Sequence, residues 1–243
     1  MNKDNIYTKM QKDFYNSTAD MMAVENHKTH DNNPDYYNLL LKEIKNQSPS
    51  WDGKIALDFG CGVGRNIDNL YKLANWNRVD GCDISEENLI RADKFLQSCD
   101  FATKLPYTLQ VTDGTTLQPL KDETYDFVMS TIVLQHIAVY DIRKSLLNDI
   151  YRVMKSGALF SFQMAKYNHA LINSANYFDN IWTASGTNGE FDVSVDDPKD
   201  LINDLINIGF QNISFEIKPD WDWINNCYLP TNRSEWIYVK AFK

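Results

Sequence analysis

Three glycines at alternate positions are the residues whose type and spacing point most directly to chemistry. Gly60, Gly62 and Gly64 follow the short apolar run 55–57 and precede a segment whose apolar residues share one helical face. The apolar run predicts a strand that is buried on both faces. Glycine lets the backbone approach a ligand closely, and a helix N-terminus offers free N–H groups. This order of elements therefore predicts a cradle for a polar or anionic group.

The spacing of the glycines separates two kinds of nucleotide site. A dinucleotide-binding fingerprint would place its third glycine at position 65, where this chain has Arg65. Asp83 ends the predicted strand 78–83, at about the distance from the glycines at which an acid reaches ribose hydroxyls. Both kinds of site use this acid in the same way, so the third glycine at position 64 is the observation that discriminates.

The pattern Asp58-x-Gly60-x-Gly62-x-Gly64 resembles the first motif of class I S-adenosylmethionine (SAM)-dependent methyltransferases. The resemblance covers residues 50–165 by motif and the last two predicted strands by pattern. It implies SAM as the cofactor, with the glycine turn packed against its methionine part.

The cofactor site that the resemblance implies draws on four loops. Asp113, after the third strand, is similar to the acid that meets the adenine amino group, although an Asx-turn is the structural alternative. Thr131 and Ile132 would touch the methionine and adenine regions. The complete predicted set is Asp58, Gly60, Cys61, Gly62, Gly64, Asn66, Asp83, Ile84, Asp113, Gly114, Thr131 and Ile132.

His136 is the candidate catalytic residue. It belongs to Leu134-Gln135-His136, which resembles a Leu-x-His segment that lies under the cofactor in many small-molecule methyltransferases. An imidazole can take up a proton near neutral pH, as a general base must. A histidine that only orders the loop or the cofactor is the alternative. The substrate-side candidates are Tyr15, His27, Tyr36, Gln135, Trp221 and Trp223.

Aromatic residues outside the glycine motif suggest walls for the cofactor and the substrate. Tyr15 and Tyr36 could offer their ring faces to a sulfonium cation. Trp221 and Trp223 stand in a long polar connection, which indicates a lid or a substrate wall, with packing over the core as the alternative.

Metal and redox signals are weak in this sequence. His27 and His30 have the three-residue spacing of a metal pair, but without a clear third ligand we predict a polar loop at a helix end and no metal site. The four cysteines form no Cys-x-x-Cys pair, which is typical of free thiols in a reducing cytoplasm.

The bulk properties exclude several partners. The 243 residues carry a net charge of −9, which argues against a nucleic-acid backbone as the main partner. No apolar stretch approaches the ~18 residues of a membrane span, and because residues 1–13 are polar we expect no secretory signal. We therefore expect a cytoplasmic protein without a membrane or nucleic-acid partner; its oligomeric state is not predicted.

The acceptor is marked less clearly than the cofactor. Residues 130–133 read Ser-Thr-Ile-Val where methyltransferases of DNA amino groups carry an Asn-Pro-Pro-Tyr-like element. A hydroxyl or amine of a small molecule or glycan is therefore the expected acceptor. The alternatives are an NAD-dependent oxidoreductase and a non-catalytic SAM-binding sensor or partner protein.

Alternating strands and helices must position these residues. We expect a doubly wound, mostly parallel seven-stranded sheet with a C-terminal antiparallel strand and an N-terminal helical cap. Residues 1–48 would form the cap, and 49–243 the SAM-binding domain, with loop insertions at 165–196 and 218–235. The expected helices cover 6–23, 34–44, 141–154 and 198–208, with another after Ser85, and the strands cover 55–57, 78–83, 107–111, 125–130, 158–164, 210–217 and 236–242.

Overall fold

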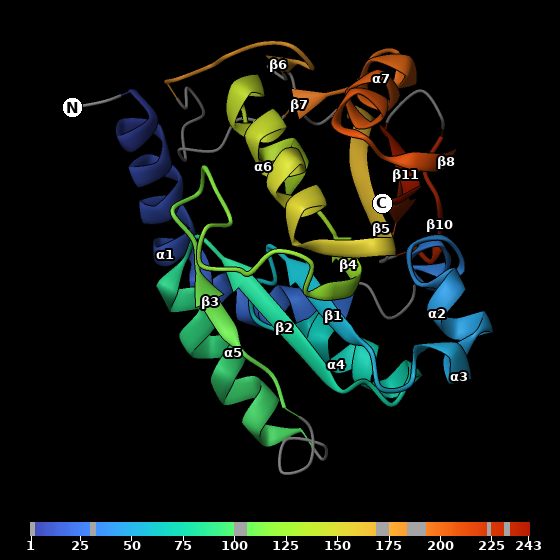
Figure 1. The fold of residues 1–243 in the computed structure, drawn as a ribbon. Helices are drawn as coiled ribbons and strands as arrows, with labels where there is room; N and C mark the ends of the chain where they lie inside the picture. The colour runs from blue at the N-terminus through green and yellow to red at the C-terminus, as the bar shows by residue number, and fades with distance from the viewer. Residues whose placement is uncertain are drawn as a thin grey trace.

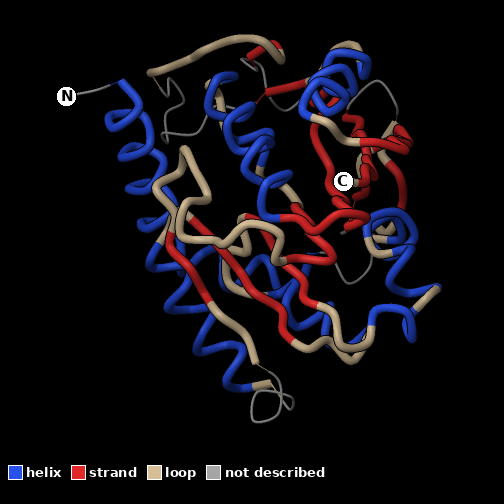
Figure 2. The backbone as a smooth tube through the Cα atoms, in the orientation of Figure 1, coloured by secondary structure: helices blue, strands red, loops and turns tan. Residues whose placement is uncertain are grey.

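The central feature of the computed structural model is one seven-stranded sheet with the strand order β3-β2-β1-β4-β5-β11-β8 (Figures 1 and 2). The structure describes residues 3–29, 33–99, 106–168, 175–183, 193–222, 225–230 and 234–243. The first five strands in this order are parallel, and β11 runs antiparallel to both β5 and β8. The predicted mostly parallel sheet with an antiparallel C-terminal strand is confirmed.

The strands of the main sheet are β1 (Ile55–Phe59), β2 (Arg78–Asp83), β3 (Leu109–Val111), β4 (Tyr125–Ser130), β5 (Met154–Asn168), β8 (Gln211–Pro219) and β11 (Ser234–Phe242). Two short pairs stand apart from it: β6 (Ala175–Asn176) with β7 (Val193–Ser194), and β9 (Trp221–Asp222) with β10 (Cys227–Tyr228). The helices are α1 (Lys3–Thr29), η1 (Tyr36–Leu40), α2 (Lys42–Asn46), α3 (Ser48–Trp51), α4 (Arg65–Leu73), α5 (Glu86–Ser98), η2 (Leu134–His136), α6 (Tyr140–Val153) and α7 (Pro198–Ile208).

Each face of the sheet carries its own hydrophobic core. On one face, side chains of α6 and α7 pack on the strands around Phe160 and Phe162, whose rings stack with centroids 4.4 Å apart. On the other face, η1, α2, α4 and α5 pack around Phe127, where Trp51 and Trp76 add their rings. Covering both faces explains why the run 55–57 in β1 is apolar without alternation.

The N-terminal segment differs from the expected one or two short helices. α1 is one continuous helix of 27 residues, and it runs beside α5 at the β3 end of the sheet (Figure 1). Its sequence contains no glycine or proline, and the hydroxyls of Ser17 and Thr18 bond back to the carbonyl of Phe14. The polar residues therefore do not interrupt the helix, because they satisfy their hydrogen bonds within it.

The expected helix over 34–44 is split in the structure. Its first part, η1, is a short π-helix, and α2 begins only after Leu41. Leu39, Leu40 and Leu41 are all buried, and three consecutive residues cannot share one face of an α-helix. The wider π-turn thus accompanies the burial of the whole leucine run, which the helical pattern alone did not reveal.

The C-terminal elements follow their local sequence signals more closely. Asp197 caps α7 by accepting a hydrogen bond from the backbone N–H of Lys199 at 3.0 Å, and Gly209 ends the helix at φ +119°. β5 is longer than the predicted 158–164 because it pairs with β11 along most of its length. The connection after β5 is also less irregular than expected, since it contains the pair β6–β7.

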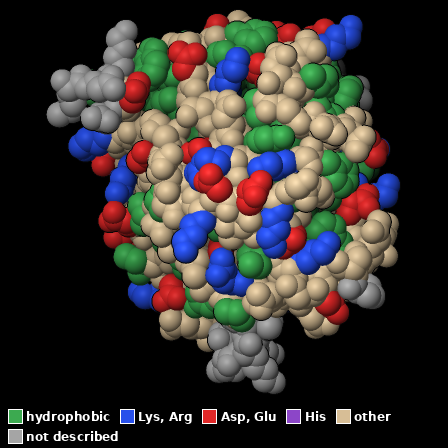
Figure 3. All heavy atoms as spheres, in the orientation of Figure 1, with side chains coloured by type: hydrophobic (Ala, Val, Ile, Leu, Met, Phe, Trp, Pro, Cys, Tyr) green, Lys and Arg blue, Asp and Glu red, His purple; other side chains and the backbone are tan. Residues whose placement is uncertain are grey.

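The surface carries both signs of charge. On the face in Figure 3, basic side chains lie among acidic ones. Ion pairs of the protein include Arg152 with Asp122 and Lys155 with Asp126. Among the described residues, no helix combines the length and the apolar composition needed to cross a bilayer.

Candidate active site

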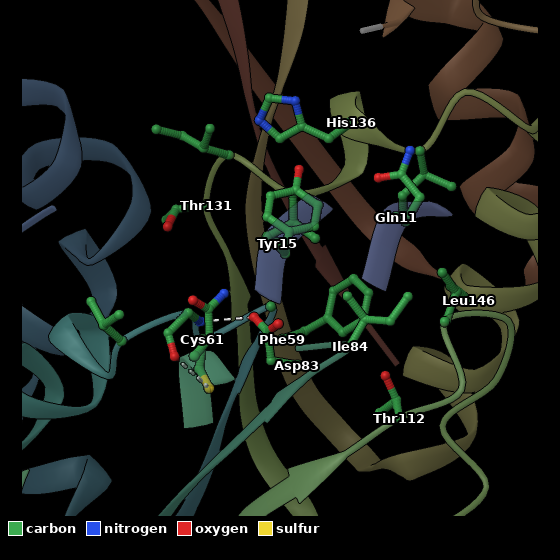
Figure 4. A pocket seen from close by; sticks show the side chains of 18 of the residues that line it. Gln11, Tyr15, Phe59, Cys61, Asp83, Ile84, Thr112, Thr131, His136 and Leu146 are labelled. Atoms are coloured by element: carbon green, nitrogen blue, oxygen red, sulfur yellow. Dashed lines mark hydrogen bonds between the residues drawn. The ribbon is translucent and has the colours of Figure 1, made fainter. Parts of the chain in front are cut away.

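A pocket opens at the carboxyl edge of β1, β2 and β4, with residues of α1 forming part of its wall (Figure 4). The predicted site residues that line it are Tyr15, Gly60, Cys61, Gly62, Asn66, Asp83, Ile84, Gly114, Thr131, Ile132 and His136. The described ones that do not line it are Tyr36, Asp58, Gly64, Asp113, Gln135 and Trp221. The side chain of His27, and the residues Trp223 and His30, lie outside what the structure describes.

The three motif glycines have different physical roles. Gly60 has φ +72°, and a Cβ added there would lie 2.3 Å from a methyl group of Val133. Gly64 has φ +86°, caps α4, and packs closely against Ala92 of α5. At Gly62, with φ +51°, an added Cβ would meet nothing within 4 Å. Gly60 and Gly64 therefore allow the chain to pack closely, whereas Gly62 borders open space in which a ligand can lie.

Asp83 joins the glycine turn to the start of α5. Its carboxylate accepts the backbone N–H of Gly62 at 2.9 Å and that of Ser85 at 2.8 Å. Burial raises the pKa of Asp83, and these backbone hydrogen bonds oppose the rise. In Figure 4 the carboxylate faces the pocket beside Cys61. The position suits an acid that receives hydroxyl donors from a bound ligand.

Asp58 lies behind the pocket wall at the base of a buried polar network. Its Oδ1 accepts a hydrogen bond from Asn66 at 3.1 Å, and the Asn66 amide also donates to Thr131 at 3.0 Å. The Tyr36 hydroxyl donates to the Asn66 side-chain oxygen at 2.7 Å. The second oxygen of Asp58 is buried without a partner. Burial raises the pKa of Asp58 to about 7, because charging a fully enclosed carboxyl is costly.

The raised pKa of Asp58 predicts a pH-dependent stability. Between its unfolded value of 3.8 and about 7, the folded state holds a proton that the unfolded state has lost, so Asp58 lowers the stability as the pH rises through this window. We expect Asp58→Asn, which keeps the acceptor for Asn66, to gain stability over wild type by up to about 1.4 kcal/mol per pH unit within the window.

Urea unfolding of both proteins across this pH range measures the difference, which should level off above pH 7. Asp122→Asn, with an exposed carboxyl at the opposite edge of the sheet, serves as the control. A constant difference between Asp58→Asn and wild type over the window would contradict the prediction.

The Asp113 side chain bonds within its own loop, as in the Asx-turn that was the structural alternative to an adenine contact. Its carboxylate accepts backbone and hydroxyl hydrogen bonds from Thr115 and Thr116, at 2.7–3.1 Å. Burial would raise the pKa of Asp113, but these hydrogen bonds outweigh it and hold the pKa below the usual range. The neighbours Thr112 and Gly114 line the pocket instead. An adenine contact through the Asp113 side chain stays a prediction.

His136 lies at the end of η2 on the pocket wall. Its ring meets that of Tyr15 edge to face, with centroids 6.5 Å apart (Figure 4). Gln135 is buried behind it, with its amide nitrogen 3.3 Å from the His136 Nε2. Ile132, four residues earlier, has φ +56°, a strained conformation for a β-branched residue. The strained residue is therefore in the loop after β4, at a position that lines the pocket.

Side chains of α6 and α1 hold the loop that carries His136 in place. The buried guanidinium of Arg143 donates to the carbonyls of Ile137 and Tyr177, and so links this loop to the connection after β5. The backbone N–H of Ala138 donates to the hydroxyl of Tyr7 at 2.7 Å. Two tyrosine rings and two carbonyls surround the Arg143 cation, which suits a buried group that has no direct carboxylate partner among the described residues.

Sequence reasoning missed most of the contribution of α1. Tyr7, Thr8 and Gln11 line the pocket together with Tyr15. Tyr7, Gln11 and Tyr15 are spaced by four residues, so they lie on one face of a helix. This four-residue spacing was visible in the sequence. It was missed because the helix was predicted from the apolar residues of the segment, and Gln11 is polar.

The strand order, the glycine turn after β1 and the acid at the end of β2 define the class I SAM-dependent methyltransferase fold. Residues 57–162 match the family described as a methyltransferase domain. This part of the chain is therefore similar to a methyltransferase domain, and the fold is that of the class whose cofactor is SAM.

Three similar proteins illustrate the likeness. A probable methyltransferase, ltbC, of Aspergillus luteorubrus is 27% identical over 128 residues, which are 52% of this chain and 45% of that protein. A chain in the complex of the Haloferax volcanii Trm112 methyltransferase activator with a methyltransferase has a TM-score of 0.64 at 16% identity, covering 95% of this chain and 96% of that one. Haemonchus contortus phosphoethanolamine N-methyltransferase 2, solved with SAM, has a TM-score of 0.59 at 18% identity, covering 85% and 52%. This chain spans less than half the length of the curated relatives it matches.

Proposed function

We propose that the protein transfers a methyl group from SAM to a hydroxyl or amine of a small molecule or glycan. The observation that carries the proposal is the pocket itself, in which the glycine turn, Asp83 and His136 face one space next to α1. Because residues of α1 form part of the pocket wall, a small or slender acceptor fits better than a folded macromolecule.

The pocket has the features that SAM requires. Open space borders Gly62, and Asp83 faces the pocket for hydroxyl donors. Thr131 and Ile132 would flank the bound molecule, and Ile84 and Leu146 would provide its apolar wall. When bound, the cofactor supplies an electrophilic methyl group on a sulfonium.

The residues of this chain would align the acceptor and exclude water. His136 would take the proton of an acceptor hydroxyl or orient the acceptor, and the Tyr15 ring would hold the imidazole in place. An amine with a free lone pair needs only the positioning part of this role.

Calorimetry with SAM and with S-adenosylhomocysteine tests the proposal. We expect both to bind, and Asp83→Ala to weaken binding by about 1.5–3 kcal/mol, because charge-assisted hydrogen bonds to the ribose are lost. Asp122→Ala, at the opposite edge of the sheet, should bind like wild type. If neither compound bound at millimolar concentration, the proposal would be wrong.

Isotope-labelled methyl-SAM incubated with cell extract, followed by mass spectrometry, would identify the acceptor. Binding of SAM without any labelled product across a broad set of acceptors would favour a non-catalytic SAM-binding protein instead.

A further inference from the structure

The small hairpin β9–β10 is fixed at the carboxyl edge of the sheet. β8 is parallel to β5, since both are antiparallel to β11, so the hairpin that follows β8 lies at the same edge as the pocket. The Asp220 side chain accepts the indole N–H of Trp236 at 2.8 Å, and the Asp220 backbone N–H donates to Ser234 at 2.9 Å. These contacts with β11 hold the start of the hairpin in a defined position.

One side chain of the hairpin reaches a buried acid in the N-terminal segment. The hydroxyl of Tyr228 donates to Oδ1 of Asp35 at 3.0 Å, across 193 positions of sequence. Asp35 is only 4% exposed. The next residue, Tyr36, bonds to Asn66 on the pocket wall at 2.7 Å. The acid is thus one residue away from a side chain anchored to the cofactor pocket.

Two polar atoms beside this contact have no partner within the part of the chain that the structure describes. Oδ2 of Asp35 and the indole nitrogen of Trp221 are both buried and make no hydrogen bond. The Trp221 ring meets the Tyr228 ring edge to face, with centroids 4.9 Å apart. Leaving a buried donor or acceptor unpaired costs about 1–3 kcal/mol, so two such atoms in one cluster call for an explanation.

The charges around Asp35 compensate its buried carboxylate only in part. Burial raises the pKa of Asp35, while the Tyr228 hydrogen bond and the charge of Lys218 oppose the rise. Lys218 is itself ion-paired with Glu216 at 3.3 Å, and Glu216 acts on Asp35 as a like charge. Tyr238, a further described neighbour that can titrate, is buried and protonated because burial raises its pKa. A cation placed at Oδ2 would complete the cluster.

We propose that Asp35, Trp221 and Tyr228 form an anchoring site for the methyl acceptor, and that the group they bind is a protonated amine with an oxygen close to it. The inference rests on the proposed function and names the chemical class of its acceptor. The free oxygen of Asp35 accepts an N–H of the ammonium, and the Trp221 indole donates to the neighbouring oxygen. The two aromatic rings add cation–π attraction.

A matched pair of small probes tests the site. Ethanolamine joins an amine to a hydroxyl, and ethylene glycol replaces the amine with a second hydroxyl. Each is titrated into ¹⁵N-labelled protein with and without S-adenosylhomocysteine, while NMR follows the Trp221 indole N–H, assigned through Trp221→Phe. We expect ethanolamine to shift this resonance saturably and ethylene glycol to leave it in place.

Asp35→Asn should weaken ethanolamine binding at least about tenfold, since it removes a charge-assisted hydrogen bond. Asp122→Asn removes an equal charge at the opposite edge of the sheet and should leave the binding unchanged. The melting of Asp35→Asn and its affinity for S-adenosylhomocysteine show whether this variant folds. If it does not fold, the comparison of ethanolamine with ethylene glycol on the wild-type protein still tests the anchoring site.

The outcomes separate this inference from the proposed function. Failure of S-adenosylhomocysteine to bind would overturn the proposed function. Binding of that compound together with no ethanolamine-dependent shift, an equal shift with ethylene glycol, or an unchanged affinity in folded Asp35→Asn would overturn the anchoring site alone.

Discussion

We expect His136→Ala to lower the turnover of methyl transfer to a hydroxyl acceptor by about 10²–10⁴-fold, the usual contribution of general-base catalysis. The affinity for SAM should stay close to that of wild type, because the imidazole lies on the wall next to Tyr15, while in the proposed function the glycine turn and Asp83 would hold the cofactor. Single-turnover kinetics and calorimetry on the same preparation measure the two quantities.

Tyr15→Phe is the matched control for this experiment, since it keeps the ring that contacts His136 and removes only the hydroxyl. A histidine that merely orders the loop would give a different pattern, in which the affinity for SAM or the melting temperature of His136→Ala falls together with the rate. Normal turnover in His136→Ala would remove this residue from the proposed function.

Gly60→Ala is expected to lower the free energy of unfolding and to weaken SAM binding. Alanine at φ +72° costs about 1–2 kcal/mol, and its Cβ would stand 2.3 Å from Val133, which adds about 1–3 kcal/mol of overpacking. Since Val133 follows the strained Ile132, the displaced loop would also misplace the pocket wall. Urea unfolding and SAM calorimetry measure both effects.

Gly53→Ala isolates the backbone term, because Gly53 has nearly the same φ of +76° and no atom within 4 Å of the added Cβ. The difference between the two variants is therefore the cost of the contact with Val133. Val133→Ala should recover part of this difference in the double variant, since it removes the two closest methyl groups. Equal destabilisation in Gly60→Ala and Gly53→Ala would contradict the steric explanation.

The sequence predicted those parts of the site that short-range spacing determines. The glycine turn and Asp83 lie within two neighbouring strand ends, so the parallel sheet brings them together without further information. Asp113 shows the limit of this reasoning. Its position after β3 was predicted, but whether its carboxylate faces the pocket or its own loop depends on Thr115 and Thr116, and both arrangements suit the sequence.

The remaining parts depend on contacts between distant segments. The helical spacing of Tyr7, Gln11 and Tyr15 could have indicated a common face, but it could not show that this face lines the pocket. The contact between Asp35 and Tyr228 joins positions 193 residues apart, and no local pattern encodes it. Such contacts arise only when the whole sheet has formed.

The links between the segment 33–51 and the last strands also limit the order in which the chain can fold on the ribosome. The Leu40 carbonyl accepts from Ser161, Glu43 pairs with Lys240, and Asp35 receives Tyr228, across 121, 197 and 193 positions. The early segment therefore emerges long before its partners are synthesised, and closing such long loops is slow. Its three consecutive leucines gain the Leu40 contact only after β5 is made, and the core that they share with Tyr238 is complete only after β11. This stretch is therefore where a nascent chain would first need a chaperone.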